Sequence, residues 1–375
     1  MYNKIRIIIS GGGTGGHIFP AISIANAIKE SSPESTILFV GASGRMEMEK
    51  VPAAGYDIKG IPARGLKRPL YSLSNIGVAR DYFKCKSLAA KIIKEFRPDV
   101  VVGVGGYASA AIVSVAAKNK IPILLQEQNS YAGIVNRRNG SSADTICVAY
   151  DGMERFFNKE KIIITGNPIR KDIIFCTPEM KAIGREFYKL DPNKKTIFVV
   201  GGSLGCRTLN NCMKREIADG SLFKEECQLI WQCGNNYRGE IDLFMNEREQ
   251  KNIFYSNFIQ RMDLAYAAAD IVVSRAGAGT ISELCVAGKC TIFVPSPVVA
   301  EDHQTHNAMA LVNKEAALMV KDSDAEKELI SKIRELIADE QKRVTLESNI
   351  AKLAKKEAAK VIAKECFKLA KDKII

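Results

Sequence analysis

The sequence predicts an α/β protein made of two similar halves, each built on a parallel β-sheet. Three observations support this: the chain has 375 residues, short β-branched runs alternate with helical stretches, and the alternation starts again at Lys195. One hydrophobic core usually stops growing below this length, so two domains are expected. Strands that alternate with helices are typical of βαβ units and therefore of parallel sheets.

The predicted elements follow from this alternation. In the first half we expect strands at residues 5–10, 36–40, 100–104, 121–126 and 145–148, with helices at 21–30, 46–54 and 108–118. In the second half we expect strands at residues 195–202, 229–233, 253–256, 271–274 and 291–295. The turn-prone Gly166-Asn167-Pro168 separates the halves, which assigns residues 1–164 and 165–349 to two domains. Beyond Asp324 the spacing is helical without a strict heptad, which favours packed helices over a coiled coil.

Glycine-rich segments stand at four strand-to-helix junctions. They are Gly11–His17, Gly103–Ser109, Gly201–Cys206 and Arg275–Thr280. Glycines let the backbone approach a phosphate closely, and the N-terminus of the following helix presents N–H groups and the positive end of its dipole. One such loop is weak support, but four across two halves predict a ligand with a diphosphate in a cleft between domains.

The first loop resembles a dinucleotide-binding fingerprint but lacks its partner residue. The second predicted strand ends in Phe39–Ser43 without an acidic residue to bind a ribose, which argues against NAD. No Gly-Lys-Ser/Thr follows, so a P-loop is excluded. His17 closes the loop, and the unperturbed pKa of histidine, about 6.5, suits a general base near neutral pH. The alternative is that His17 only braces the loop.

The chain carries a net charge of +12, which indicates an anionic partner or an ordinary solvated basic surface. Nucleic acid is not expected, because the chain has one Trp, dispersed basic residues and no recognition motif. The ten cysteines form no C-x-x-C pair, which predicts free thiols in a reducing compartment. The uncharged run Val100–Ala117 is rich in small residues, so a strand, turn and helix explain it better than a membrane span. Lys4–Ile9 leaves no room for a signal peptide.

Six segments in order along the chain resemble the MurG family, the peptidoglycan N-acetylglucosaminyltransferases of glycosyltransferase family 28. They are Gly12–His17, Gly105–Tyr107, Gln126–Asn129, Gly166–Arg170, Gly201–Ser203 and Asp302–Ala308. The match runs from Ile5 to about Ala317. The resemblance implies a GT-B fold, in which two Rossmann-like domains with parallel sheets face an interdomain cleft. It also implies that a final helix, expected at about residues 350–375, returns to the first domain.

The implied reaction is transfer of N-acetylglucosamine from UDP-N-acetylglucosamine to the 4-hydroxyl of lipid I, MurNAc-(pentapeptide)-pyrophosphoryl-undecaprenol. The product is lipid II of peptidoglycan biosynthesis, formed with inversion. In this family the N-terminal domain takes the acceptor and the C-terminal domain the donor. One alternative is another GT-B transferase that uses a UDP-sugar on a different lipid or small-molecule acceptor. A further alternative is an inactive sensor of nucleotide sugars.

The resemblance also implies roles for individual residues. His17 is the implied general base, with Glu127 as the next candidate. The implied acceptor-diphosphate contacts are Gly13, Gly105, Gly106 and Tyr107. The implied contacts with sugar or donor are Thr14, Gly15, Gly16, Asn129, Arg170, Ser203, Ile259 (through its backbone, to uracil), Ala278, Gly279, Thr280, Glu283 (to the ribose) and Gln304. A carboxylate one turn past a helix N-terminus can reach a ribose, and an arginine can stabilise the charge on departing UDP.

The sequence departs from the family pattern at two positions. Gln126 stands where a histidine is common, which leaves His17 as the histidine of the N-terminal loops. Leu204 stands where a glutamine is common, which puts a side-chain role there in doubt. No Asp-x-Asp ends a strand to hold Mg²⁺ on a diphosphate, so no metal or other cofactor is expected.

Apolar and basic residues interleave between Leu66 and Lys86. They include Lys67, Arg68, Leu70, Leu73, Ile76, Tyr82, Phe83 and Lys84. Such a segment can lie on anionic headgroups, although an amphipathic helix facing the core would show a similar pattern. With the resemblance, it favours a peripheral position on the cytoplasmic face of the bacterial inner membrane.

Overall fold

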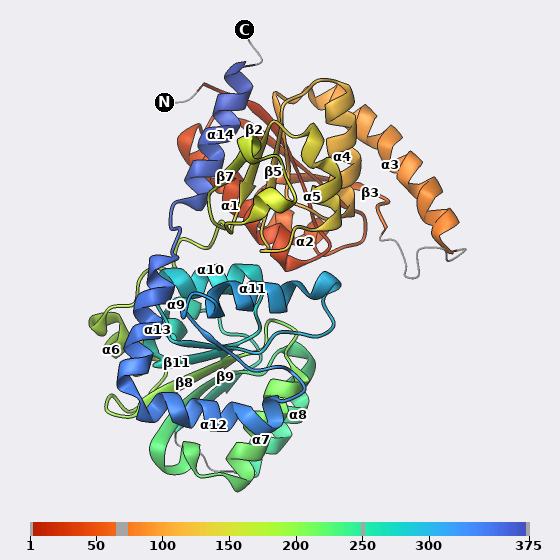
Figure 1. Ribbon diagram of the computed structural model, residues 1–375. Helices are drawn as coiled ribbons and strands as arrows, with labels where there is room; N and C mark the ends of the chain where they lie inside the picture. The colour runs from red at the N-terminus through yellow and green to blue at the C-terminus, as the bar shows by residue number, and fades with distance from the viewer. Residues whose placement is uncertain (1–2, 65–73, 249–251, 373–375) are drawn as a thin grey trace. The chain divides into compact units, whose positions relative to one another are not determined.

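The computed structural model describes residues 3–64, 74–248 and 252–372, which form two compact units (Figure 1). Unit 1 contains Met1–Ile169 and Lys355–Ile375, and unit 2 contains Arg170–Ala354. We expected the boundaries after residues 164 and 349. In the structure they follow Ile169 and Ala354, five residues later in each case. Gly166–Pro168, expected to open the second domain, therefore lies in unit 1.

Unit 1 is built on a seven-stranded parallel sheet in the order β3-β2-β1-β4-β5-β6-β7. The strands are β1 Arg6–Ser10, β2 Thr36–Ala42, β3 Asp57–Ile61, β4 Val100–Gly103, β5 Ile123–Glu127, β6 Thr145–Val148 and β7 Ile162–Ile164. β1 and β4 are neighbours, so the glycine loops that follow them leave the same edge of the sheet. The uncharged run at residues 100–117 forms β4 and a helix, as predicted.

Helices cover the sheet of unit 1. They are α1 Gly15–Ser31, α2 Glu47–Ala53, α3 Ser74–Phe96, α4 Tyr107–Lys118, α5 Ile134–Asn139 and α14 Ala358–Asp372. The first helix was expected at residues 21–30, but it begins at Gly15 and contains Pro20. Pro20 has no N–H to bond to the carbonyl of Gly16, so the helix continues past this point with one hydrogen bond fewer. Gly15, Gly16 and His17 therefore form its first turn.

The final helix also differs from its expected range of 350–375. α13 spans Glu340–Lys352 in unit 2, and α14 begins only at Ala358, after a break. Leu346 on α13 is buried in the core of unit 2, whereas Ile362 and Phe367 on α14 are buried in unit 1 against Ile24 of α1. The single helix expected here is interrupted between α13 and α14, because the apolar residues before and after the break belong to different cores.

Unit 2 is built on a six-stranded parallel sheet in the order β10-β9-β8-β11-β12-β13. The strands are β8 Lys195–Val200, β9 Cys227–Gln232, β10 Ile253–Ser256, β11 Ile271–Ser274, β12 Thr291–Phe293 and β13 Leu318–Met319. Its α-helices are α6 Pro178–Phe187, α7 Arg207–Asp219, α8 Arg238–Asn246, α9 Met262–Ala268, α10 Ala278–Ala287, α11 His303–Val312, α12 Ala325–Ala338 and α13. All ten cysteines are free thiols, and nine are buried as small apolar side chains. Among the described residues, no helix is long and apolar enough to cross a membrane.

Candidate functional site

The first two glycine loops contact each other in unit 1. Gly106 has φ 84°, and a Cβ placed there would lie 2.5 Å from the carbonyl oxygen of Gly12. Gly105 has φ 94°, and a Cβ there would lie 2.9 Å from Nε2 of His17. Only glycine fits these two positions, because any side chain would meet the backbone or the imidazole. The predicted acceptor loops and the predicted base thus form one surface.

Glu47 holds the first glycine loop, and sequence reasoning missed it. Its Oε2 accepts a hydrogen bond from the N–H of Gly13 at 3.0 Å, and its Oε1 accepts one from the N–H of Ala42 at 2.9 Å. The side chain is buried, with 1% of the residue exposed. An acid that binds ribose would stand at the end of the second strand, whereas Glu47 stands on α2 and binds the backbone. The N–H of Gly13 therefore donates to Glu47 here, and its role as an acceptor-diphosphate contact stays a prediction.

His17 lies in the first turn of α1, where Thr14 orients its ring. Thr14 has the extended backbone of a helix N-cap, but its hydroxyl makes no capping bond to the helix backbone. Instead Thr14 Oγ1 lies 3.2 Å from Nδ1 of His17. The other ring nitrogen, Nε2, lies against Gly105 of the neighbouring loop. Tyr107, the first residue of α4, is about half exposed.

Glu127 ends β5 as a buried carboxylate that orders the next loop. Oε1 accepts from the backbone N–H and the side-chain amide of Asn129, at 3.0 and 3.2 Å. Oε2 accepts from the N–H of Gly133 at 3.0 Å and from Nδ2 of Asn136 at 2.9 Å. Burial raises the pKa of Glu127, although these four donors oppose the shift. With 1% exposure and both oxygens occupied, Glu127 positions Asn129 rather than offering an accessible base.

Gln126 belongs to a buried amide network that joins β5 to the Gly166–Pro168 turn. Its Nε2 donates to Oδ1 of Asn167 at 3.0 Å, and its Oε1 accepts from Nε2 of Gln128. Nδ2 of Asn167 donates in turn to the carbonyl oxygen of Gln128 at 3.0 Å. An amide suits this position because it donates and accepts at once. Gln126, which stands where histidine is common in the family, therefore has a structural role.

In unit 2, Arg170 and Glu283 pair directly. Arg170 Nε lies 3.0 Å from Glu283 Oε1, and Nη2 lies 3.2 Å from Oε2. The hydroxyl of Tyr266 donates to Oε2 at 3.1 Å. Burial and the charge of Glu283 raise the pKa of Tyr266 well above its usual value. Glu283 lies on α10, one turn past the first-turn residues Ala278–Thr280, as the resemblance implies.

Gln304 ties two loops of unit 2 together. Its Oε1 accepts from the N–H of Ala276, after β11, at 3.2 Å and from the N–H of Ser296, after β12, at 2.9 Å. Glu301 and Asp302 precede it with φ of 53° and 51°. Consecutive non-glycine residues in this region are strained, which is typical of functional segments. The amide oxygen is fixed by the backbone, so a sugar hydroxyl would meet the NH₂ end.

Gln232, at the end of β9, is a second residue that sequence reasoning missed. Its Nε2 donates to the carbonyl of Gly202 at 3.0 Å, and its Oε1 accepts from the N–H of Ile259 at 2.9 Å. It therefore joins the third glycine loop to the predicted uracil contact. The N–H of Ile259 is already hydrogen-bonded to Gln232. Its carbonyl oxygen is therefore the backbone group that can accept a hydrogen bond from a nucleobase. Ser203 and Leu204 are exposed at the tip of the loop.

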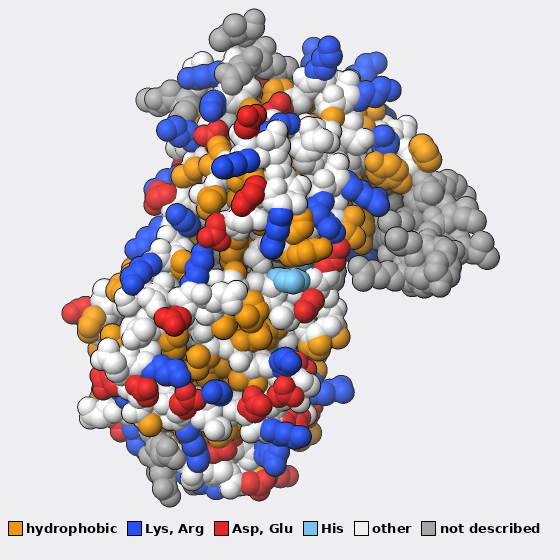
Figure 2. All heavy atoms as spheres, in the orientation of Figure 1, with side chains coloured by type: hydrophobic (Ala, Val, Ile, Leu, Met, Phe, Trp, Pro, Cys, Tyr) orange, Lys and Arg blue, Asp and Glu red, His pale blue; other side chains and the backbone are white. Residues whose placement is uncertain are grey.

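The predicted membrane segment is only partly described. Residues 65–73, with Leu66, Lys67, Arg68, Leu70 and Leu73, lie outside the described residues, as does the side chain of Ile76. On α3, Cys85 and Ala89 are buried in the core, whereas Phe83 is 73% exposed and Tyr82 is 39% exposed. Figure 2 shows hydrophobic side chains exposed over α3. The helix thus has a core face and an exposed aromatic pair. Among described side chains, no three His, Cys, Asp or Glu gather as a metal site.

The comparisons with known proteins agree on one family. Residues 7–148 match the glycosyltransferase family 28 N-terminal domain, and residues 196–365 match its C-terminal domain. The UDP-N-acetylglucosamine--N-acetylmuramyl-(pentapeptide) pyrophosphoryl-undecaprenol N-acetylglucosamine transferase of Phocaeicola vulgatus is 53% identical over 371 residues, covering 99% of this chain and 98% of the relative. The transferase of the same name from Parabacteroides distasonis is 50% identical over 366 residues, covering 98% of both chains.

Solved structures share the fold. The crystal structure of Acinetobacter baumannii MurG matches with a TM-score of 0.78 at 24% identity, covering 98% of this chain and 100% of that one. The UDP-GlcNAc 2-epimerase of Neisseria meningitidis bound to UDP-GlcNAc matches with a TM-score of 0.65 at 13% identity, covering 98% and 100%. The predicted class, GT-B with two Rossmann-like units on parallel sheets, is confirmed. An epimerase shares this fold, so the fold alone does not fix the reaction.

Proposed function

The chain belongs to glycosyltransferase family 28, and from this membership we infer that it transfers N-acetylglucosamine from UDP-N-acetylglucosamine to lipid I. The product is lipid II, the precursor of peptidoglycan, and the transfer inverts the anomeric carbon. The observation that carries this is identity of about half over the full chain to transferases named for this reaction. A radiolabelled transfer assay with lipid I against glycolipid acceptors tests it. Transfer to the glycolipids but not to lipid I would show a different member of the fold.

The donor is proposed to bind on unit 2. The first turn of α10, at Ala278, Gly279 and Thr280, presents backbone N–H groups and the positive end of the helix dipole to the diphosphate. Glu283, one turn further on, accepts the ribose hydroxyls. The Ile259 carbonyl, held by Gln232, accepts from the uracil N–H.

The sugar of the donor is proposed to lie beside Gln304, whose amide oxygen is fixed by two backbone N–H groups. The side-chain NH₂ then points its donors at a sugar hydroxyl. Ser203, at the tip of the third loop, adds a hydroxyl near the diphosphate. Asn129, positioned by Glu127, is proposed as a further contact to the donor sugar.

His17 is proposed as the general base. With Nδ1–H donated to Thr14 Oγ1, the lone pair on Nε2 takes the proton of the acceptor 4-hydroxyl. The hydroxyl oxygen then forms a bond to the anomeric carbon, and the bond from that carbon to the diphosphate oxygen breaks. The electron pair leaves with UDP, and attack from the opposite face inverts the configuration. The Thr14 hydroxyl can accept this hydrogen bond, which suits the tautomer that the step requires.

The charge on departing UDP is proposed to be stabilised without a metal ion. The N-terminus of α10 and the guanidinium of Arg170 supply positive charge to the diphosphate. Preorganised donors of this kind act where negative charge develops in the transition state. Turnover that fell with EDTA and returned with Mg²⁺ would contradict this part of the proposal.

The acceptor is proposed to bind on unit 1 from a membrane surface. Gly15 and Gly16 in the first turn of α1 and Gly106 and Tyr107 at the start of α4 offer backbone N–H groups to its diphosphate. Exposed Phe83 on α3 suits insertion among lipid headgroups, with basic residues beside it. The enzyme would then sit peripherally on the cytoplasmic face of the bacterial inner membrane, where its lipid-linked substrate lies.

A further inference from the structure

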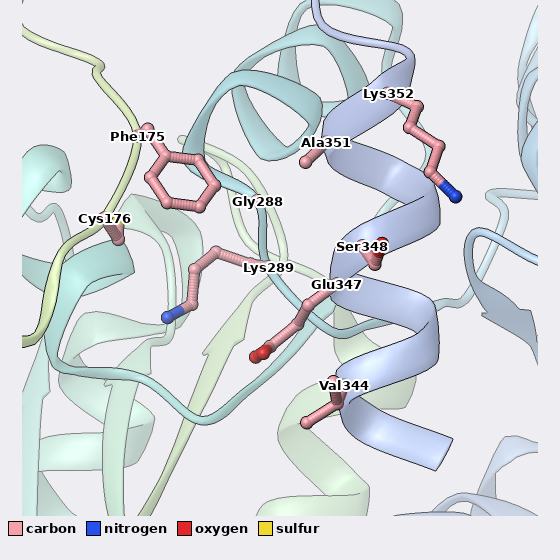
Figure 3. A pocket seen from close by; sticks show the side chains of 9 residues that line it. All are labelled: Phe175, Cys176, Gly288, Lys289, Val344, Glu347, Ser348, Ala351 and Lys352. Carbon is pink, nitrogen blue, oxygen red and sulfur yellow. The ribbon is translucent and has the colours of Figure 1, made fainter. Parts of the chain in front are cut away.

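Unit 2 contains a pocket of about 590 Å³ that the transfer reaction does not use (Figure 3). It lies at the C-terminal end of α10, opposite the first turn proposed for the diphosphate. Its walls come from Phe175 and Cys176, from Gly288 and Lys289 after α10, and from one face of α13. The volume falls in the range of about 300–1,000 Å³ that is usual for small-molecule sites.

Lys289 is the unusual residue of this pocket. Only 6% of it is exposed, and among the described residues its ammonium group makes no hydrogen bond or ion pair. The nearby carboxylate of Asp270 is already held by Lys181 at 2.6 Å and by Arg185 at 2.7 Å. Burial lowers the pKa of Lys289. A buried cation without a partner costs several kcal/mol, so an anion that reached Lys289 Nζ would be stabilised there.

Glu347 on α13 does not supply that anion in the structure. Its carboxylate and the Lys289 amino group both extend into the space between α13 and the segment with Phe175 and Cys176 (Figure 3). No ion pair joins them, and burial raises the pKa of Glu347, which favours its neutral form. Glu347 therefore leaves the Lys289 ammonium open to an anionic ligand.

The remaining walls are apolar and partly open to solvent. Phe175 is 48% exposed and Val344 is 50% exposed, and Ala351 lies about two helical turns further along α13. The Lys352 side chain extends away from Lys289, and its ammonium donates to Oδ1 of Asn349 at 3.1 Å (Figure 3). A molecule with an apolar body and one anionic group would cover the exposed Phe175 ring and Val344 and pair with the buried cation. A more highly charged group would meet repulsion from Glu347.

We propose that this pocket binds a small amphipathic monocarboxylate. Its carboxylate pairs with Lys289 Nζ, and its apolar body lies along Phe175 and Val344. Phe175 stands five residues after the start of unit 2, at Arg170, and Ala351 stands three residues before its end, at Ala354. The ligand therefore joins the two segments by which the chain enters and leaves unit 2. The site is independent of the transfer chemistry proposed above.

Three matched compounds test the charge preference on the full chain: 3-phenylpropanoate, 3-phenylpropylamine and 3-phenylpropan-1-ol. Titration by ligand-observed NMR is expected to rank the carboxylate tightest. Amide hydrogen exchange is expected to slow at residues 174–176, 288–290 and 344–352 when it binds. Binding of the amine or the alcohol at least as tight as the carboxylate, no binding of the carboxylate, or protection elsewhere would overturn the proposal.

Variants then assign the charge to its residue. Lys289→Met is expected to fold, because it removes an unpaired buried charge, and to weaken 3-phenylpropanoate at least tenfold. Glu347→Gln is expected to tighten binding severalfold by removing the neighbouring negative charge. Lys327→Met, at an exposed position on α12, is the control and leaves binding unchanged. Should Lys289→Met fail to fold, weaker binding in Glu347→Gln would still overturn the proposal, as would unchanged affinity in a folded Lys289→Met.

Discussion

Arg170 and Glu283 form a two-point ion pair, with Nε 3.0 Å from Oε1 and Nη2 3.2 Å from Oε2. The proposed roles of both residues, at the diphosphate and at the ribose, use the groups that here bind each other. The donor must therefore share or replace this pair when it binds. The side chains are 39% and 14% exposed, so solvent weakens the pair and lowers the cost of opening it.

Glu283→Ala tests the ribose contact. Loss of hydrogen bonds to a charged group removes about 1.5–3 kcal/mol, so KM for UDP-N-acetylglucosamine should rise roughly tenfold to a hundredfold. Steady-state kinetics and calorimetric titration of UDP measure this. Glu328→Ala, which removes an exposed carboxylate from α12, should leave both values unchanged. A normal donor KM in Glu283→Ala would rule out the ribose assignment.

His17→Gln tests the base. Glutamine keeps a polar side chain in the first turn of α1 but cannot take the proton, so kcat should fall by about 10²–10⁴-fold. Donor KM should stay within twofold, because His17 is not among the residues proposed to bind the donor. His306→Gln, at an exposed position on α11, is the matched control. If kcat were nearly unchanged in His17→Gln, His17 would only brace the loop.

Glu47→Ala tests whether the buried carboxylate positions the first glycine loop. The change leaves the N–H groups of Gly13 and Ala42 without their acceptor, so the loop should lose its set conformation. KM for lipid I should rise about tenfold, the effect of about 1.4 kcal/mol, while donor KM stays constant. Glu49→Ala on the exposed face of the same helix is the control. Equal losses for donor and acceptor would indicate general unfolding instead of a positioning role.

The membrane proposal predicts that the exposed end of α3 binds anionic lipid. Phe83→Ser combined with Lys84→Glu should weaken co-sedimentation with vesicles of anionic phospholipid by about tenfold, since each basic residue near the surface contributes about 1 kcal/mol. Neutral vesicles should show little binding of either protein. Lys118→Glu, with the same change of charge at the end of α4, should bind like the parent. Unimpaired sedimentation of the double variant would remove α3 from the membrane contact.

Asp270 links pH to the stability of unit 2. Burial raises its pKa, but hydrogen bonds and charges from Lys181, Arg185 and the Thr196 N–H outweigh burial and hold the pKa below its usual value. Its contribution is therefore present above the unfolded pKa of about 3.9 and is lost as pH falls through the folded value. Urea unfolding at pH 7 should show that Asp270→Asn costs about 3 kcal/mol, because Arg185 loses its buried partner.

Two comparisons in the same series of unfolding curves test whether the effect comes from the Asp270 charge. As the pH falls through the folded pKa of Asp270, the Asp270→Asn variant and the parent should converge, because the parent carboxylate becomes protonated. Asp219→Asn, at an exposed position in unit 2, should match the parent at every pH. A constant difference between Asp270→Asn and the parent across this range would contradict the assignment to the Asp270 charge.

The fold was predictable where apolar residues were continuous. β6 and β11, which are buried, begin and end where the β-branched runs do, and so does the half-buried edge strand β10. The edge strand β3 was missed, because Asp57–Ile61 is mostly exposed and carries little apolar signal. The break between α13 and α14 was missed as well. No Pro or Gly marks it, and only the division of apolar residues between two cores produces it.

The candidate site was predictable in its loops but not in its supports. Glycine spacing located the segments around His17 and Gly105, since tight turns at strand ends need positive φ. Glu47 and Gln232 left no such mark. Glu47 accepts a hydrogen bond from a backbone group 34 residues away in the chain, and Gln232 donates one to a backbone group 30 residues away. Contacts of that kind depend on which strands are neighbours, and residue spacing does not carry this information.

Release of UDP from UDP-N-acetylglucosamine, measured with and without a lipid I analogue, tests the central claim most directly. The reaction assigned here transfers the sugar to an acceptor hydroxyl activated on unit 1. UDP should therefore appear rapidly only when the analogue is present, in amounts equal to the lipid II formed. UDP release at the same rate without the analogue, or no release with it, would contradict the assignment.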